Sequence, residues 1–179
     1  MFRPYIKRTS VLVFVAVINL LLVYISYISY EFKAFEHYDA KIKSAQIMKD
    51  ALRSTRNFSN DKITSVSTQS LSYDRFNSGI IGVDSTSSSI TTKEGSLYSK
   101  VAVTNPNFSA LFIQLFSEID SSLLNPNKVD TIAVSYTGSF PGANIALLAA
   151  CKAVNIYPVI ISSICSSSWG ANQINMTWA

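Results

Sequence analysis

The feature that most constrains this chain is an uncharged apolar run near its N-terminus. No charged side chain occurs from Thr9 to Tyr30, and residues 11–30 form the almost wholly apolar run VLVFVAVINLLLVYISYISY. A helix of about 20 residues, rising about 1.5 Å per residue, spans the ~30 Å hydrocarbon core of a bilayer. We therefore predict a transmembrane helix over residues 11–30, with the lipid bilayer as its surroundings.

Two other structures can produce such a run. A buried core helix is one, but core helices are rarely uncharged for so long. A cleavable signal peptide is the other, yet this run is long and ends in YISY rather than in a small-x-small cleavage site. Its tyrosines resemble interfacial aromatics, whose rings lie among lipid headgroups. We therefore predict an uncleaved anchor, represented by Val11, Leu21, Tyr24, Tyr27 and Tyr30.

The charges that flank the anchor predict its orientation. Residues 1–10 form a short basic tail with Arg3, Lys7 and Arg8 and no acid. The other flank carries interleaved charges of both signs: Glu31, Lys33, Glu36, Asp39, Lys41 and Lys43. Because cations collect on the cytoplasmic side of a membrane helix, we expect a cytoplasmic N-terminus and a main domain on the opposite side.

The net charge does not indicate a nucleic-acid partner. Of the 15 basic residues, three lie in the tail, which leaves 12 basic against 11 acidic residues in the rest of the chain. The main domain is thus nearly neutral, whereas nucleic-acid-binding domains carry a concentrated positive charge. The basic tail suits anionic lipid headgroups.

The segment after the anchor, residues 31–58, has the pattern of a helical stalk. Apolar residues recur every three or four positions: Phe35, Tyr38, Ile42, Ala45, Met48 and Leu52. No Pro or Gly occurs from Tyr5 to Phe58, so anchor and stalk can form one continuous rod. Packing of the stripe on its own domain is one interpretation. A coiled-coil seam with a second copy or a partner subunit is the alternative, with Phe35, Ile42 and Met48 as the contact residues.

The rest of the chain has the pattern of an α/β domain. Residues 59–78 are rich in Ser, Thr and Asp and predict a loop, and residues 79–179 form the domain. The run GIIGV at residues 79–83 predicts a short strand. Asn105-Pro106 predicts a helix start, followed by an apolar stripe at Phe108, Leu111, Phe112, Leu115, Phe116 and Ile119.

The clearest pattern in this domain is a strand–helix–strand unit. The run VDTIAVSY is followed by the turn TGSFPGAN, the helix ANIALLAACKAVN and the strand YPVIISS. This order predicts parallel strands with a right-handed crossover. The predicted fold class is α/β: a transmembrane helix and stalk, then an incomplete three-layer domain built on a parallel sheet.

Polar loops follow both predicted strands. Ligands of open parallel sheets bind beyond the carboxyl ends of the strands, so residues 137–142 and 162–172 should share one edge. The first loop opens a helix, whose N-terminus favours an anion, although Pro141 removes one N–H donor. A plain strand-to-helix turn is the alternative interpretation.

Several specific chemistries are absent from the sequence. There is neither a G-x-S-x-G elbow nor a G-K-[ST] phosphate loop, and the single histidine, His37, lies in the stalk. A Ser-His-Asp triad and a zinc site are therefore not expected, and we predict no metal and no cofactor. Cys151 falls in an apolar helical run and predicts a buried thiol; a disulfide to Cys165 is the alternative in an oxidising compartment.

Four ordered motifs resemble one family. ITTKEGSL (residues 90–97), TNPNFSAL (104–111), GSFPGAN (138–144) and SSWGAN (167–172) occur in this order in the poly-γ-glutamate system protein family, which also has the anchor and the following helix. The resemblance implies a membrane-anchored accessory component in making, exporting or retaining an anionic γ-linked glutamate polymer. It implies the bacterial inner membrane as location, and synthase membrane subunits or the polymer itself as partners.

The resemblance carries over no known catalytic residue. The matching positions and the serine-rich loop supply ligand-binding candidates: Thr91, Thr92, Asn105, Ser139, Asn144, Ser166, Trp169 and Asn172. This sequence departs from the family pattern at Gly142 and near Cys165. Family members also continue past the tryptophan that matches Trp178, so we expect a truncated domain.

Two further functions stay open at the level of sequence. One is a hydrolase or transferase for γ-glutamyl bonds, with Ser139, Thr91 or Thr92 as nucleophile, for which no catalytic base is evident. The other is a small-molecule sensor with an α/β domain.

Overall fold

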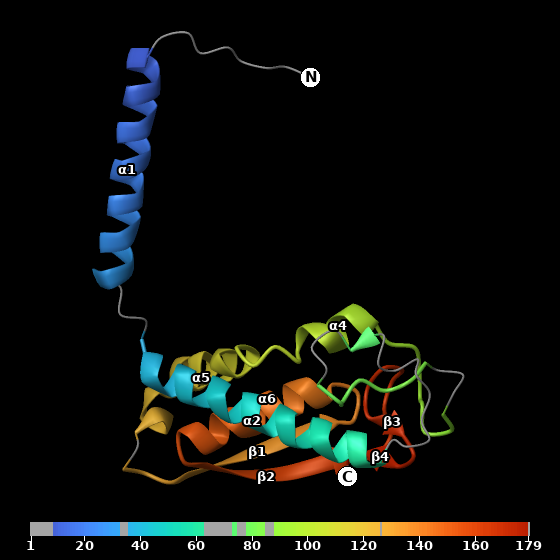
Figure 1. The fold of residues 1–179 in the computed structure, drawn as a ribbon. Helices are drawn as coiled ribbons and strands as arrows, with labels where there is room; N and C mark the ends of the chain where they lie inside the picture. Colours follow the sequence, from blue (N-terminus) through green and yellow to red (C-terminus); the bar gives the residue numbers. More distant parts are fainter. Residues whose placement is uncertain are drawn as a thin grey trace. The chain divides into compact units, whose positions relative to one another are not determined.

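A computed structural model describes residues 9–32, 36–62, 73–74, 78–84, 88–125 and 127–178, apart from the side chains of residues 30–32 and 60–62. The chain divides into an anchor unit, Met1–Tyr38, and a globular unit, Asp39–Ala179. Figure 1 shows the elements in order: α1 (Thr9–Phe32), α2 (Tyr38–Lys62), α4 (Leu97–Ala102), α5 (Phe108–Ile119), η2 (Ser121–Leu124), β1 (Asp130–Thr137), α6 (Pro141–Ala153), β2 (Ile156–Ser163), β3 (Asn172–Gln173) and β4 (Met176–Thr177).

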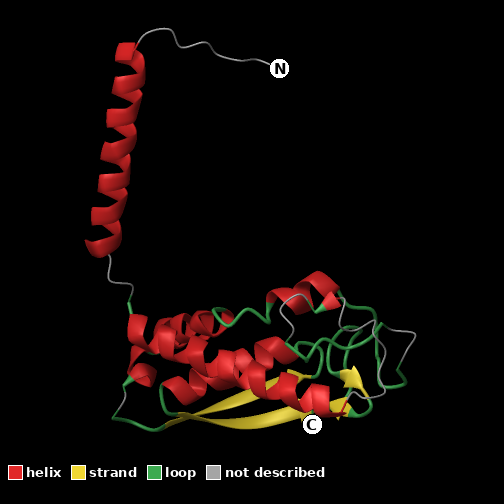
Figure 2. Cartoon of the chain, viewed as in Figure 1, coloured by secondary structure: helices red, strands yellow, loops and turns green. Residues whose placement is uncertain are grey.

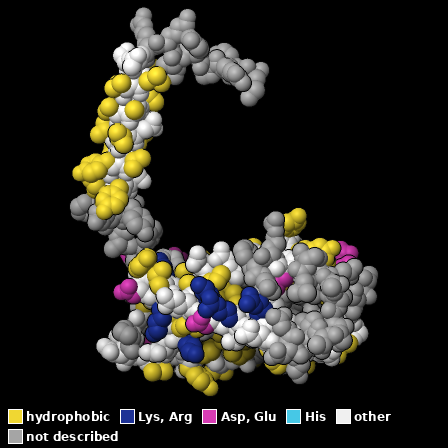
Figure 3. Space-filling view, viewed as in Figure 1, with side chains coloured by type: hydrophobic (Ala, Val, Ile, Leu, Met, Phe, Trp, Pro, Cys, Tyr) yellow, Lys and Arg dark blue, Asp and Glu magenta, His cyan; other side chains and the backbone are white. Residues whose placement is uncertain are grey.

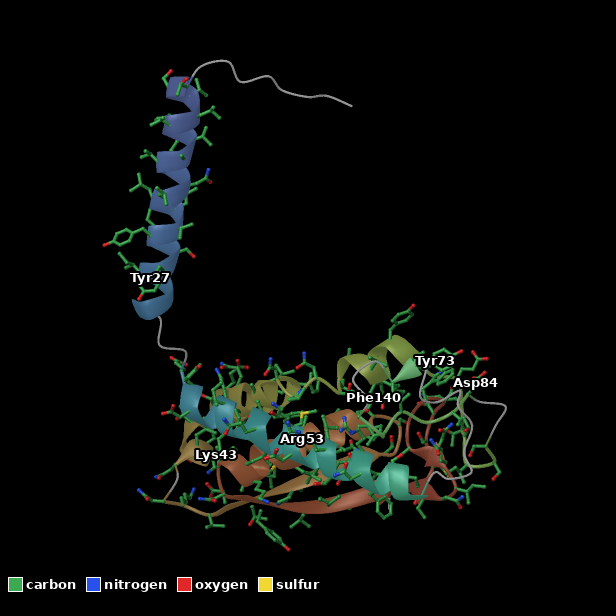
Figure 4. The ribbon with its side chains drawn as sticks, in the orientation of Figure 1. Tyr27, Lys43, Arg53, Tyr73, Asp84 and Phe140 are labelled. Carbon is green, nitrogen blue, oxygen red and sulfur yellow. The ribbon has the colours of Figure 1, made fainter. Side chains whose placement is uncertain are left out.

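Helix α1 has the length and composition of a membrane span. Its segment Thr9–Ser29 contains 21 residues, and none of its most apolar window is buried against protein. Val11, Leu21 and Tyr24 are exposed, as is Tyr27, which Figure 4 labels. Tyr30 lies in α1, but its side chain is outside the described residues. A single N-terminal apolar helix whose side chains face outward all round is compatible with a single-pass membrane anchor.

Anchor and stalk are not one continuous rod. Helix α1 ends at Phe32 and α2 begins at Tyr38, with a turn at Glu36 and His37 between them. His37 has φ of +57°, which a right-handed helix does not accommodate. Helix α2 also runs to Lys62, so the loop predicted from residue 59 starts too early.

Helix α2 packs on its own domain, as the first interpretation of its stripe requires. Met48 has no exposed surface and Leu52 is buried, both in a cluster with Ile145 and Ala149 of α6. The prediction of Met48 as a partner contact is therefore wrong, because this chain already covers it. Ile42 is 41% exposed, and Phe35 lies outside the described residues.

The predicted strand–helix–strand unit is confirmed. Strands β1 and β2 pair in parallel, with a register from Asp130 opposite Ile156 to Thr137 opposite Ser163. Helix α6 connects them and contributes the largest share of the core, including Ala146, Ala150 and Cys151. Both core clusters contain α6 residues, so this helix joins α2 and α5 to the sheet.

Among the described elements, α2, α5 and α6 all lie on one side of the two strands (Figure 2). The opposite face of β2 exposes Tyr157, Val159 and Ile161, the last at 74%. The observed class is therefore mixed helix and strand with a small parallel sheet. The third layer of the predicted three-layer arrangement is not found among the described residues.

Two local predictions are wrong for identifiable reasons. Residues 79–83 form no strand; they are mostly buried, and Gly82 and Val83 form backbone hydrogen bonds with Trp169 of a loop instead of with a strand. Helix α5 begins at Phe108, two residues after Pro106. The intervening turn has backbone hydrogen bonds that span three residues rather than four, and the Asn105 side chain accepts from the Asn107 N–H (3.0 Å). The predicted stripe of α5 is also only half buried: Leu111, Leu115 and Ile119 are exposed.

Candidate functional site

The loops that follow β1 and β2 lie against each other at the carboxyl end of the sheet. We call residues 164–172 the serine loop. Its Ser167 N–H donates to Ser139 Oγ (3.0 Å), its Ser166 Oγ donates to the Gly138 carbonyl (3.0 Å), and its Ala171 N–H donates to the same carbonyl (2.8 Å). The two loops therefore share one edge, as parallel strands require.

A third segment, residues 88–96, completes this arrangement. Thr91 forms a parallel bridge with Ser166, and the Thr92 N–H donates to the Ser166 carbonyl (2.8 Å). Next, the Ser168 N–H donates to the Lys93 carbonyl (3.0 Å), and the Gly95 N–H donates to Ser168 Oγ (2.8 Å). The serine loop is thus fixed by hydrogen bonds on two sides.

Asn172 is a structural residue of this cluster. It is fully buried, and its side-chain amide accepts from the Val83 N–H (2.9 Å) and donates to the Val83 carbonyl (2.8 Å) and to Thr91 Oγ1 (2.9 Å). One side chain therefore satisfies backbone groups that a neighbouring strand would satisfy in a sheet. This explains why residues 79–83 can be buried without forming a strand.

Trp169 holds an unusual backbone conformation in the serine loop. Its φ is +65°, which is costly for a bulky side chain and persists only where the surroundings enforce it. Its N–H donates to the Val83 carbonyl (2.9 Å), and its carbonyl accepts from the Gly82 N–H (3.2 Å). A Cβ on Gly82 would lie 1.9 Å from the Gly170 carbonyl oxygen. The ring of Trp169 also contacts Tyr73 edge-on, with centroids 5.0 Å apart.

The other two predicted residues have separate places. Asn144 is buried in α6 and donates to the Thr137 carbonyl (2.8 Å), so it closes the turn between β1 and α6. Asn105 is exposed in the turn before α5; its N–H donates to the Ala102 carbonyl at the end of α4, and its side chain accepts from the Asn107 N–H. The structure therefore gathers Thr91, Thr92, Ser139, Ser166, Trp169 and Asn172, with Asn144 as support, and leaves Asn105 outside.

The structure adds a pair that the sequence did not indicate: Lys100 and Ser167. Lys100 is only 2% exposed. Its Nζ donates to Ser167 Oγ at 2.9 Å and lies 3.5 Å from the centroid of the Phe140 ring. Burial, followed by the field of Lys93, lowers the pKa of Lys100 from 10.5 to about 8. Figure 4 labels Phe140.

Only a weak sequence signal marks this pair. Lys100 and Val101 follow Leu97 by three and four residues in α4, so all three lie on one face of this helix. Lys100 and Val101 are both buried. A lysine there is ordinarily a solvated charge. Ser167, for its part, is one of three consecutive serines, and nothing in their order distinguishes it from Ser166 or Ser168.

A second polar feature is a groove along α2 with a volume of about 260 Å³. It is lined by three cations, Lys49, Arg53 and Arg56, together with Leu52, Ser78, Thr104 and Pro106. We call it the basic groove. Among the described residues none of its lining side chains is acidic; Arg53 makes one exposed contact, 3.8 Å from Asp50. Figure 3 shows cationic side chains, with an acidic one among them, on the face of the globular unit that bears α2, and Figure 4 labels Arg53.

An apolar cavity lies near the loops. It measures about 250 Å³ and is lined by Thr55, Phe58, Gly79, Ile80, Gly82, Pro141, Gly170, Ala171, Gln173, Met176, Thr177 and Trp178, none of which titrates. The described residues hold no group of three metal-binding side chains. Both cysteines are free thiols, and burial raises the pKa of Cys151 to about 11.

Comparisons with known proteins assign no family to this chain. No protein-family model, no curated protein and no solved structure matches it. Its function must therefore be argued from the anchor, the loops and the basic groove.

Proposed function

We propose that this chain is a membrane-anchored accessory component that binds an anionic γ-linked glutamate polymer beside the membrane where the polymer is made or exported. The observation that best supports this proposal is the basic groove. Lys49, Arg53 and Arg56 line it along one side of α2, and none of its described lining residues is acidic. The motif resemblance supplies the identity of the polymer, and the groove supplies a place for it.

The chemistry of such a polymer matches the groove. A γ-linked chain leaves one α-carboxylate free on every unit. Lys49 and Arg56 are separated by two helical turns, about 10 Å along the axis, so the groove offers cations to successive carboxylates of one extended chain. Arginine is well suited to this role because its guanidinium forms paired hydrogen bonds to a carboxylate.

Other cations of α2 are already used inside the globular unit. Lys41 donates to Gln114 Oε1 (2.6 Å), and Lys43 donates to the Ala153 carbonyl (2.8 Å). Lys49 and Arg53 are instead exposed. This division supports a binding role for the groove, because the structural cations and the groove cations lie on different parts of the helix.

Tethering gives such binding its purpose. An anchor in the bacterial inner membrane, with a cytoplasmic N-terminus and the globular unit outside, keeps the groove close to membrane-embedded synthase subunits. The effective concentration of a tethered module is high without any new contact.

In this proposal the exposed face of β2 with Tyr157 and Ile161 also favours a three-layer domain, because parallel sheets are normally covered on both faces.

The proposal is tested with the full chain in lipid nanodiscs and fluorescent poly-γ-glutamate. Arg53→Gln with Arg56→Gln should weaken binding about tenfold, which corresponds to about 0.7 kcal/mol for each charge. Lys128→Gln with Lys152→Gln removes the same charge elsewhere in the globular unit and is the control. Equal weakening by both double variants would mean unspecific attraction, and no binding by the unaltered chain would reject the polymer as ligand.

A second arm examines the partner subunits. The full chain is captured from membranes of cells that make the polymer, and synthase subunits are sought by mass spectrometry. Recovery that persists in the Arg53→Gln, Arg56→Gln variant would assign synthase contact to a surface other than the groove, and loss of recovery would assign it to the groove.

A further inference from the structure

We propose that Ser167 and Lys100 form a nucleophile–base pair that transfers acyl groups from carboxylic amides or esters. The pair is defined by its geometry: Lys100 Nζ and Ser167 Oγ are 2.9 Å apart, within the range at which a base takes the proton of a nucleophile. Serine with lysine as base is a known alternative to serine with histidine. This inference does not depend on polymer binding by the basic groove.

A purely structural role explains this lysine poorly. Both side chains are buried, Lys100 at 2% and Ser167 at 3% exposure. Among the described residues no carboxylate pairs with Lys100; its contacts are a neutral hydroxyl and the Phe140 ring. Burying an ammonium without an opposite charge is costly, and an apolar side chain would fill the same space without that cost.

Burial also prepares the lysine for proton transfer. With its pKa near 8, about a tenth of Lys100 is a neutral amine at pH 7, compared with fewer than one in a thousand for a solvated lysine. A base is most effective when its pKa lies near the working pH. No catalytic base for an acyl-transfer reaction was evident in the sequence. In this proposal Lys100, which is distant from Ser167 in the chain, is that base.

The serine loop holds Ser167 in place. Its own N–H is bound by Ser139 Oγ (3.0 Å), and its neighbours Ser166 and Ser168 are bound to Gly138 and Lys93. Two residues further on, Trp169 keeps its left-handed conformation. Such rigid support and local strain are typical of reacting groups rather than of plain turns.

The reaction balances without any other component than water. Ser167 Oγ attacks the carbonyl carbon while its proton passes to the neutral Lys100 amine. The carbon–nitrogen or carbon–oxygen bond of the substrate breaks, and the leaving amine or alcohol takes this proton from Lys100. Water then attacks the Ser167 ester and gives a proton to Lys100. The bond between Ser167 Oγ and the acyl carbon breaks, Lys100 returns this proton to Ser167 Oγ, and a carboxylic acid leaves.

Access to the pair depends on Phe140. Its ring lies over Lys100 Nζ and is 40% exposed, so it separates the pair from solvent. In this proposal a substrate reaches the pair when this one side chain rotates away. The position of Phe140, between β1 and the first residue of α6, places the entrance at the edge of the sheet where ligands of parallel sheets bind.

The test uses the full chain in nanodiscs and a small alkyl fluorophosphonate, which forms a covalent adduct with activated serines. The unaltered chain should gain the mass of one adduct, mapped to Ser167 by peptide mass spectrometry. Phe140→Ala should label several-fold faster, because the cover is gone. Ser167→Ala should lose the adduct, and Lys100→Met should slow labelling about a hundredfold, as loss of a general base does.

Matched variants keep the result interpretable. Lys100→Arg retains a cation that cannot act as a base, so a folded Arg variant should also label slowly. Ser162→Ala removes an exposed hydroxyl of the same region and should label like the unaltered chain. Absence of a Ser167 adduct in both the unaltered chain and Phe140→Ala, or full-rate labelling of folded Lys100→Arg, would overturn the proposal.

Discussion

At the scale of single residues, Lys100 and Asn172 show how much one buried polar side chain determines here. Asn172 replaces part of a strand ladder for Val83. Lys100 joins α4 to the serine loop through one hydrogen bond that spans 67 positions of the chain. Both side chains form their hydrogen bonds with residues of a distant segment, so the local sequence around Asn172 or Lys100 does not predict either role.

The buried lysine predicts a pH dependence of stability. Its pKa is 10.5 when unfolded and about 8 when folded, so between these values the unfolded chain binds more protons and the free energy of unfolding rises with pH. Cys151, with its pKa raised from 9.0 to about 11, acts in the opposite direction above pH 9. We therefore expect stability to rise by about 1 kcal/mol from pH 8 to pH 9.

This rise is measured by urea unfolding of the full chain in detergent micelles, followed by tryptophan fluorescence. Lys100→Met should remove it and should also be more stable than the unaltered chain at pH 7. The same rise in a folded Lys100→Met variant would mean that another group causes it.

At the scale of elements, α2 shows that one helical pattern is compatible with two environments. Its apolar spacing predicts a buried stripe, and the structure buries Met48 and Leu52 against α6. The same spacing fits a seam with a second chain equally well, because periodicity states which face is apolar and not what covers it.

Two substitutions on α2 separate these environments. Met48→Ala should destabilise the globular unit by about 2–5 kcal/mol, since Met48 is fully buried and the change leaves a cavity. Ile42→Ala, at 41% exposure on the same helix, should cost under about 1 kcal/mol. Urea unfolding of both full-chain variants measures the difference, and similar small costs would indicate that Met48 is not in the core.

The predictable and unpredictable elements differ in the range of the interactions that form them. The strand–helix–strand unit was predictable because its strands and helix are apolar enough to be recognised one by one and follow each other within a short stretch. The turn at His37 was not, since neither Pro nor Gly marks it and a positive φ at histidine has no strong local cause. Helix α5 starts two residues after Pro106, behind a turn whose backbone hydrogen bonds span three residues rather than four.

At the scale of the whole molecule, the apolar side chains of the anchor unit and those of the globular unit have different surroundings. The apolar side chains of α1 are exposed, whereas those of α6 are buried within the globular unit. Only a lipid bilayer or another protein can cover a helix that is apolar all round.

The membrane anchor gives a prediction at this scale. Leu20→Arg with Leu21→Arg places two charges near the middle of α1, each costing about 2.5–3.5 kcal/mol at a helix centre. The variant should be released from membranes by alkaline carbonate, while the unaltered chain stays. Thr9→Arg with Ser10→Arg adds the same charge at the end of the helix and should stay as well; release of both would point to a peripheral association.

Sequence alone determined the properties that depend on composition and on spacing within a few turns: the membrane-length helix, the parallel strand pair with its connecting helix, and the polar loops at one edge. The tertiary structure decided what covers each apolar face, where the helices are interrupted, and that Lys100 meets Ser167. The physical reason is the same in each case. Local periodicity sets the conformation of a segment, whereas burial, pKa and hydrogen-bond partners depend on segments that only the folded chain brings together.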